Sequence, residues 1–99
     1  MKEINPQELK EKINLGEKFV VDFYATWCGP CKMMLRVLEE HHSKFGVPVY
    51  KFNIENDRQL SMDYGIRSVP TIIFFNESKV QKKHVGILTE NQFNSFTNL

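Results

Sequence analysis

The chain has 99 residues, which is enough for a single domain with one hydrophobic core, and we expect residues 1–99 to form that domain. Hydrophobic residues make up 41% of the composition and charged residues 25%, proportions that are typical of a folded protein and not of a disordered one. Thirteen basic and twelve acidic side chains give a formal net charge of +1, so we expect no binding to nucleic acid or to anionic membranes.

Signal segments and membrane-spanning segments are not apparent in the sequence. Residues 1–6 contain no apolar run of the kind found in signal peptides, and no later run approaches the length needed to cross a bilayer. We therefore expect a cytoplasmic protein. Separately, we expect it to act as a monomer.

The first part of the chain predicts a helix followed by a buried strand. Asn5 is a good helix N-cap, Glu8 is placed to complete a capping box, and Gly16 can end the helix. Residues 19–24 form a mostly apolar run of strand length, as in buried parallel strands. Asp22 is the one charged residue in this run, which makes it a candidate functional residue.

The middle of the chain predicts a long helix, a strand and a short helix. The long helix should begin at residues 28–30 and continue to about Phe45, because apolar side chains recur at helical spacing and Gly46 can end it. Residues 47–54 then predict a strand, and residues 58–64 predict a short helix.

The last part of the chain predicts a hairpin and a final helix. Residues 71–75 and 80–85 predict two strands joined by a turn over residues 76–79. Thr89 and Gln92 have the spacing of a capping box at the start of the last helix. The order of the elements argues for a three-layer α/β fold, in which a central mixed β-sheet with a parallel portion and an antiparallel edge hairpin is flanked by helices.

The two cysteines, Cys28 and Cys31, are separated by two residues, so they cannot join distant parts of the chain, and their closeness indicates chemistry instead. One alternative is a metal site, because this spacing is half of a zinc knuckle. Zinc requires about four ligands, and the remaining candidates His41, His42 and His84 match no common pattern. We therefore expect no metal and no other cofactor.

The segment around these cysteines, Trp27-Cys28-Gly29-Pro30-Cys31-Lys32, belongs to a wider pattern. The other parts of this pattern are Val21-Asp22-Phe23-Tyr24-Ala25, Lys51, Ile66-Arg67-Ser68-Val69-Pro70-Thr71 and Val85-Gly86. With these residues the chain resembles the thioredoxin family along essentially its whole length. The resemblance implies a thioredoxin-like fold and the activity of a protein disulfide reductase and electron carrier. A thioredoxin-like oxidase or isomerase, and a non-catalytic binding module, are the alternatives.

Disulfide exchange requires one thiolate that attacks and a second thiol that resolves the mixed disulfide. Cys28 should be the nucleophile at an exposed helix start, because the free backbone N–H groups and the helix dipole favour its thiolate there. Cys31 lies nearly one turn further into the helix, is more shielded, and should resolve the mixed disulfide. Gly29 should let a partner backbone approach, and Pro30 should fix the first turn of the helix.

Asp22 is expected to have a raised pKa, because desolvation in a buried strand disfavours its charged form. The resemblance implies that Asp22 exchanges protons with Cys31, directly or through water, and that Lys51 on the neighbouring strand tunes it. The alternative is that Asp22 and Lys51 form a structural pair without a kinetic role.

The resemblance also implies a substrate site beside the cysteines. The Val69–Pro70 peptide bond would be cis and would face the cysteine pair, and the backbone of Val69 would pair with an extended substrate segment. The apolar docking surface would comprise Trp27, Ile54, Val69, Val85, Gly86 and Ile87. For Ile54 and Val85, a plain core role is nearly as plausible.

Two residues depart from the family pattern. Arg36 occupies a helix position where relatives usually carry proline, so we expect a helix that is straighter or differently bent. Ser78 occupies a turn position that glycine usually holds, which affects only the expected hairpin geometry.

The resemblance implies two kinds of protein partner. Disulfide-containing proteins would be the substrates, and a flavoprotein thioredoxin reductase drawing on NADPH would return electrons to the cysteine pair. The chain has no glycine-rich dinucleotide fingerprint, so we expect it to bind no nicotinamide itself.

Overall fold

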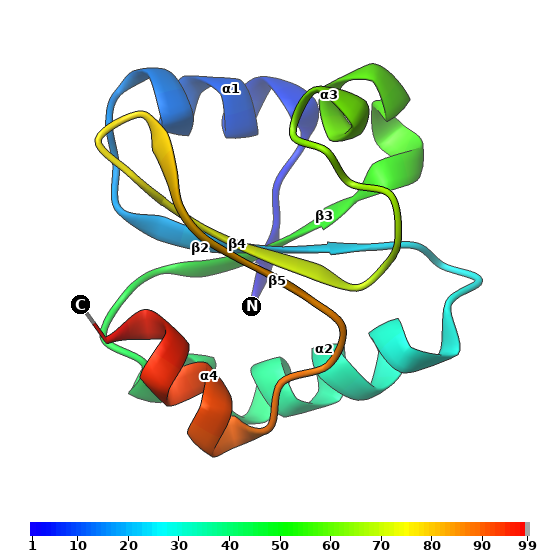
Figure 1. Cartoon of the computed structure of the whole chain (residues 1–99), viewed down its shortest axis with the longest axis vertical. Coiled ribbons are helices and arrows are strands. Elements are labelled where there is room, and N and C mark those ends of the chain that lie inside the picture. Colours follow the sequence, from blue (N-terminus) through cyan, green and yellow to red (C-terminus); the bar gives the residue numbers. More distant parts are fainter. Residues whose placement is uncertain (99) are drawn as a thin grey trace.

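The computed structural model describes residues 1–98, in which a five-stranded sheet lies between two pairs of helices (Figure 1). The strands are β1 (Lys2–Glu3), β2 (Phe19–Tyr24), β3 (Val49–Asn53), β4 (Thr71–Asn76) and β5 (Lys79–Val85). The helices are α1 (Pro6–Asn14), α2 (Gly29–His41), α3 (Arg58–Asp63) and α4 (Glu90–Thr97), with 3-10 turns η1 (His42–Lys44) and η2 (Ile54–Asn56). Helices α1 and α3 cover one face of the sheet, and α2 and α4 cover the other.

The sheet has the order β1-β3-β2-β4-β5. Strands β1, β3 and β2 are parallel to one another, β4 runs antiparallel to β2, and β5 runs antiparallel to β4. This arrangement confirms the predicted mixed sheet with an antiparallel edge hairpin. Strand β1 was not predicted, because Lys2 and Glu3 are both exposed and carry no apolar alternation. They join the sheet through their backbones, alongside Tyr50 and Lys51 of β3.

The predicted helix starts are confirmed at α1 and α4. The Asn5 side chain accepts a hydrogen bond from the Glu8 backbone N–H at 2.8 Å, and the Glu8 side chain accepts one from the Asn5 N–H at 3.0 Å. Thr89 and Gln92 form the same reciprocal pair at the start of α4. Each box satisfies backbone donors that would otherwise lack a partner in the first turn.

The predicted extent of the long helix is wrong at its C-terminal end. Helix α2 ends at His41 and not near Phe45, and the next three residues tighten into η1. The tighter turn still buries the Phe45 side chain, so the apolar spacing alone suggested a longer α-helix. Gly46 then adopts a φ of +73°, which is unfavourable for a residue with a side chain. The helix is continuous across Arg36.

The hairpin between β4 and β5 forms without glycine. Glu77 and Ser78 occupy the two central turn positions, with φ values of 54° and 65°. Both values are unusual for residues with side chains, so the position of Ser78 carries a local backbone cost that glycine would avoid. The strands on either side pair from Asn76 with Lys79 to Thr71 with Val85, with a bulge near Phe75.

Strand β2 separates two hydrophobic clusters. Phe19, Val21 and Phe23 are fully buried beneath α1 and α3, whereas Val20 packs beneath α2 and α4. Asp22 alternates with these residues and lies on the same face as Val20. No helix within residues 1–98 combines the length and the apolar composition that crossing a bilayer requires.

Candidate active site

The cysteine pair lies at the N-terminus of α2, where the sequence predicted it. Cys28 is the N-cap residue, Gly29 begins the helix, and a disulfide joins Cys28 to Cys31 with a Cα–Cα distance of 5.3 Å. The Cys31 backbone N–H donates a hydrogen bond to Cys28 Sγ at 3.2 Å. A helix N-terminus presents its free N–H groups and the positive end of its dipole, so negative charge on Cys28 Sγ is favoured in the reduced form.

Cys28 is less exposed than the sequence predicted. Only 5% of its surface is accessible, against 0% for Cys31, because both pack in a small apolar cluster with Ala25. Ile54 and Val69 complete the cover over this cluster. The prediction that Cys28 is exposed is therefore wrong for its side chain. Cys31 is nevertheless the more shielded of the two cysteines, as predicted.

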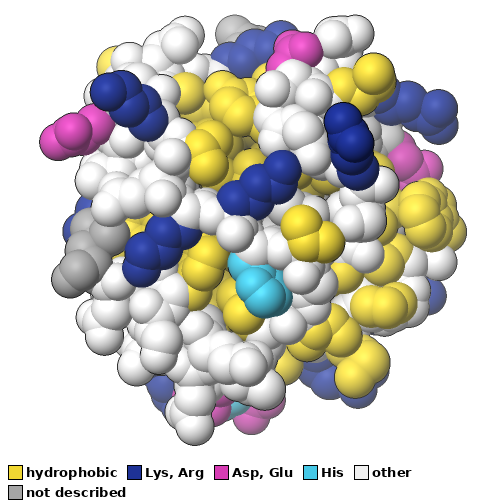
Figure 2. All heavy atoms as spheres, viewed as in Figure 1, with side chains coloured by type: hydrophobic (Ala, Val, Ile, Leu, Met, Phe, Trp, Pro, Cys, Tyr) yellow, Lys and Arg dark blue, Asp and Glu magenta, His cyan; other side chains and the backbone are white. Residues whose placement is uncertain are grey.

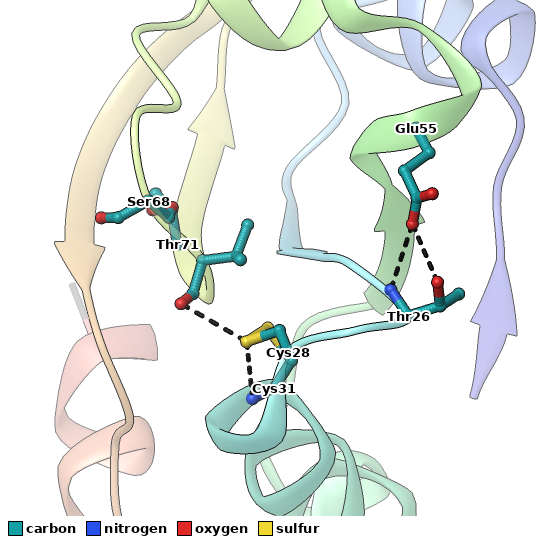
Figure 3. The surroundings of a disulfide bond; sticks show 7 residues. Thr26, Cys28, Cys31, Glu55, Ser68 and Thr71 are labelled. Carbon is teal, nitrogen blue, oxygen red and sulfur yellow. Dashed lines mark hydrogen bonds between the residues drawn. A yellow bond between two sulfur atoms is a disulfide. The ribbon is translucent and has the colours of Figure 1, made fainter.

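A loop from between α3 and β4 approaches the cysteine pair (Figure 3). The Val69–Pro70 peptide bond is cis, as the resemblance implied, and the Val69 carbonyl oxygen lies 3.5 Å from Cys28 Sγ. The Thr71 hydroxyl donates to the Ser68 carbonyl at 2.7 Å, which closes the loop. The Gly86 N–H donates to the Pro70 carbonyl at 2.8 Å, and Gly86 has a φ of +102° that favours glycine.

A second anchor, which the sequence reasoning missed, holds the segment before Cys28. Both the backbone N–H and the hydroxyl of Thr26 donate to Glu55 Oε1, at 3.2 and 2.9 Å (Figure 3). The bonds tie the loop after β2 to the turn after β3. The only available signal was the position of each residue just past a strand end, where polar side chains meet at the sheet edge.

Asp22 lies opposite Lys51 in the pairing of β2 with β3. Its side chain is fully buried, and neither of its carboxylate oxygens has a hydrogen-bond partner within residues 1–98. Burial raises the pKa of Asp22 to about 7, and the positive charge of Lys51 opposes part of that rise. The predicted direction is confirmed. The ion pair that Lys51 forms is with Glu39 of α2, at 3.8 Å, a contact that the sequence reasoning also missed.

Large exposed hydrophobic residues lie near the cysteine pair. Trp27 is 71% exposed. Val85, the last residue of β5, and Ile87 just after it are also exposed, which rules out the core role considered for Val85. Figure 2 shows hydrophobic side chains along the right-hand margin of the molecule, where Figure 1 places the loop between β2 and α2. Beside Trp27 a cleft of about 330 Å³ is lined by Trp27, Ile54, Glu55, Arg58, Ser61, Met62 and Ile66. The predicted docking residues thus lie on two sides of the cysteine pair, with Trp27 and Ile54 at the cleft.

A disulfide at a helix N-terminus, a cis-proline loop against it and a buried acid form the arrangement that the resemblance to the thioredoxin family implied. A thioredoxin family model matches residues 1–98. The chain belongs to the thioredoxin family. It is similar to thioredoxin from Mycoplasmoides gallisepticum, at 39% identity over 89 residues that cover 89% of both chains. It is 37% identical over 97 residues to thioredoxin from Buchnera aphidicola subsp. Acyrthosiphon pisum, covering 95% of this chain and 90% of the relative.

Solved thioredoxin structures confirm the thioredoxin-like fold. A mutant thioredoxin from Halobacterium salinarum NRC-1 has a TM-score of 0.84 and 29% identity, covering 100% of this chain and 91% of that one. Chloroplastic thioredoxin z also has a TM-score of 0.84, with 27% identity over 98% of this chain and 90% of that one. Family membership and the close cysteine pair identify the chain as a thiol–disulfide oxidoreductase, a protein disulfide reductase that acts on disulfide-containing substrates.

Proposed function

We propose that Cys28 is the attacking nucleophile of this member of the thioredoxin family and that Cys31 resolves the mixed disulfide. The observation that carries this proposal is the 3.2 Å hydrogen bond from the Cys31 N–H to Cys28 Sγ, because the same donor would stabilise a Cys28 thiolate. The small accessible area of Cys28, against none for Cys31, supports the same order of attack.

The proposed reaction has two displacement steps. The Cys28 thiolate attacks one sulfur of the substrate disulfide, the second substrate sulfur leaves as a thiolate, and a mixed disulfide forms. Cys31 then loses its proton and attacks the Cys28 sulfur, so that the remaining substrate sulfur leaves. The substrate gains two electrons, and the protein ends in the Cys28–Cys31 disulfide form that the structure contains.

Asp22 is proposed to accept the proton that Cys31 loses, directly or through water. A carboxyl group with a pKa of about 7 can both take up and release a proton near neutral pH. Lys51 is proposed to tune this group, because its charge opposes the rise in the Asp22 pKa.

Substrate proteins are proposed to dock as extended segments beside the cis-proline loop. The Val69 carbonyl, 3.5 Å from Cys28 Sγ, supports this position for the backbone of a substrate. Gly29 supports it too, because a Cβ atom added there would meet nothing within 4 Å, so the space beside its backbone is open to a partner. The proposed contact residues are Trp27, Gly29, Pro30, Val69, Pro70 and Gly86.

The Cys28–Cys31 disulfide must be reduced again after each cycle. We propose that a thioredoxin reductase drawing on NADPH does this. We further propose that residues 1–99 act as a single domain, as a monomer and in the cytoplasm, where thiols are kept reduced.

Reduction of insulin by the purified protein tests the proposed function. With dithiothreitol as the electron source, the protein should accelerate cleavage of the insulin disulfides well beyond the rate of dithiothreitol alone. The Cys28→Ser variant is the matched control and should return the rate to that of dithiothreitol. Replacing dithiothreitol by NADPH and thioredoxin reductase tests the partner, and NADPH oxidation should depend on Cys28. A rate equal to that of dithiothreitol alone would refute the proposal.

A further inference from the structure

A row of side chains runs across the sheet on the face that α2 covers. The pairing of the strands aligns Glu3, Lys51, Asp22, Ile72 and His84, from β1 through β3, β2 and β4 to β5. Ile72 separates Asp22 from His84, so the charged neighbour of Asp22 in this row is Lys51. The charge of Asp22 also acts on Tyr24, two residues further along β2.

Besides Asp22, two acidic side chains, Glu3 and Glu39, lie around Lys51, and Lys51 forms an ion pair only with Glu39. Glu3 accepts a hydrogen bond from the Tyr24 hydroxyl. Glu39, which reaches over from α2, places Oε1 3.8 Å from Lys51 Nζ, while its other oxygen lies 3.4 Å from the amine of Met1. Glu39 is exposed and Lys51 is half-buried, so the ion pair places the ammonium group near the surface of the protein.

The consequence of this pairing falls on Asp22. Lys51 forms no ion pair with Asp22, and both oxygens of that buried carboxyl lack a hydrogen-bond partner within residues 1–98. A lysine that turned fully toward Asp22 would stabilise the charged carboxylate by direct pairing. Glu39 competes for the same ammonium group and therefore limits how strongly Lys51 can act on Asp22.

We propose that Glu39 is a positioning residue for disulfide exchange, which holds Lys51 away from direct pairing with Asp22 and so leaves the Asp22 carboxyl able to take up and release a proton. This inference rests on the proposed role of Asp22 in proton transfer. Glu39 touches neither substrate nor sulfur, and it acts through Lys51. Loss of Glu39 frees Lys51 to approach Asp22, which lowers the pKa of Asp22.

The titration of Asp22, followed by carbon NMR of its carboxyl group, tests the inference directly. The oxidised protein is used, because its cysteines are joined and do not titrate. We expect Glu39→Gln to lower the midpoint for Asp22 by about half a pH unit, a modest shift because exposed ion pairs are weak. Glu40→Gln is the matched control, since Glu40 is exposed and contacts His41 instead, and it should leave the midpoint unchanged.

A double-mutant cycle with Lys51→Met separates this route from any other effect of Glu39, including the loss of its contact with Met1. In the Lys51→Met background, Glu39→Gln should no longer move the Asp22 midpoint. An unchanged or raised midpoint in the Glu39→Gln single variant would overturn the inference, as would an equal shift with and without Lys51.

The pH profile of insulin reduction distinguishes this inference from the proposed function beneath it. If Asp22 transfers the proton, the limb of the profile that reports Asp22 should move to lower pH in Glu39→Gln by the same amount as the NMR midpoint. A moved midpoint with an unmoved profile would refute the role of Asp22 in catalysis while supporting control of Lys51 by Glu39.

Discussion

Phe23 and Asp22 are neighbours in β2, and both are fully buried, but their side chains lie on opposite faces of the sheet. Phe23 packs beneath α1 and α3, where its ring centroid lies 5.6 Å from that of Phe52 and the surrounding cluster is apolar. Asp22 is enclosed beneath α2 with no hydrogen-bond partner in the described part of the chain. The comparison shows that burial of Phe23 stabilises the fold, whereas burial of Asp22 changes the protonation of a reactive group at a cost in stability.

The largest effect is expected at Phe23. Phe23→Ala should reduce the free energy of unfolding by about 3–5 kcal/mol, because it removes a fully buried ring and leaves a cavity against Phe52. Urea denaturation followed by circular dichroism measures this loss. Phe23→Leu keeps most of the apolar volume and should cost clearly less. A loss below about 1 kcal/mol for Phe23→Ala would show that Phe23 is not tightly packed.

Asp22→Asn should raise the free energy of unfolding, whereas Phe23→Ala lowers it. The pKa of Asp22 is raised from 3.8 to about 7, so the folded protein binds this proton more tightly than the unfolded chain does. The free energy of unfolding of the wild type should therefore fall as pH rises between these two values and level off above about pH 7. About three pKa units correspond to on the order of 4 kcal/mol, and the neutral amide escapes this cost.

Urea denaturation at several pH values measures that difference. The stability gain of Asp22→Asn over the wild type should be close to zero at about pH 4 and largest at about pH 8. Insulin reduction by the variant should be slower and should lose the pH dependence that Asp22 contributes. A gain that does not depend on pH would mean that Asp22 is not the group titrating, and an unchanged rate would leave it a structural residue.

Local patterns in the sequence were sufficient for the elements that depend on neighbouring residues. The capping boxes at Asn5 and Thr89, the bounds of β2 and the cysteine pair at the start of α2 were all predictable, because each is decided within a few residues. The end of α2 was not, since an α-helix and a 3-10 turn both direct Phe45 into the core. Strand β1 was missed because it is held by backbone pairing alone.

In the candidate site, too, features decided by neighbouring residues were predictable, and features decided by residues distant in sequence were not. The raised pKa of Asp22 followed from one charged residue in an apolar strand, but the low exposure of Cys28 depends on Val69, which is distant in sequence. The position of Glu39 in α2 was already a sign in the sequence that its side chain could reach the sheet. It lies four residues after Leu35, at the margin of the buried face of α2, whereas Glu40 lies on the solvent side. Which acid meets Lys51 became clear only from the packing of α2 on the sheet.

The division of labour between the two sulfurs is the central claim, and trapping of mixed disulfides tests it most directly. Each single variant, Cys31→Ser and Cys28→Ser, is mixed with a disulfide-bearing protein and examined by non-reducing electrophoresis, with a reduced sample as the control. Cys31→Ser should accumulate a covalent adduct, because Cys28 attacks and nothing releases it, whereas Cys28→Ser should form none at a comparable rate. Equal trapping by both variants, or trapping by Cys28→Ser alone, would contradict the assignment of Cys28 as the nucleophile at the N-terminus of α2.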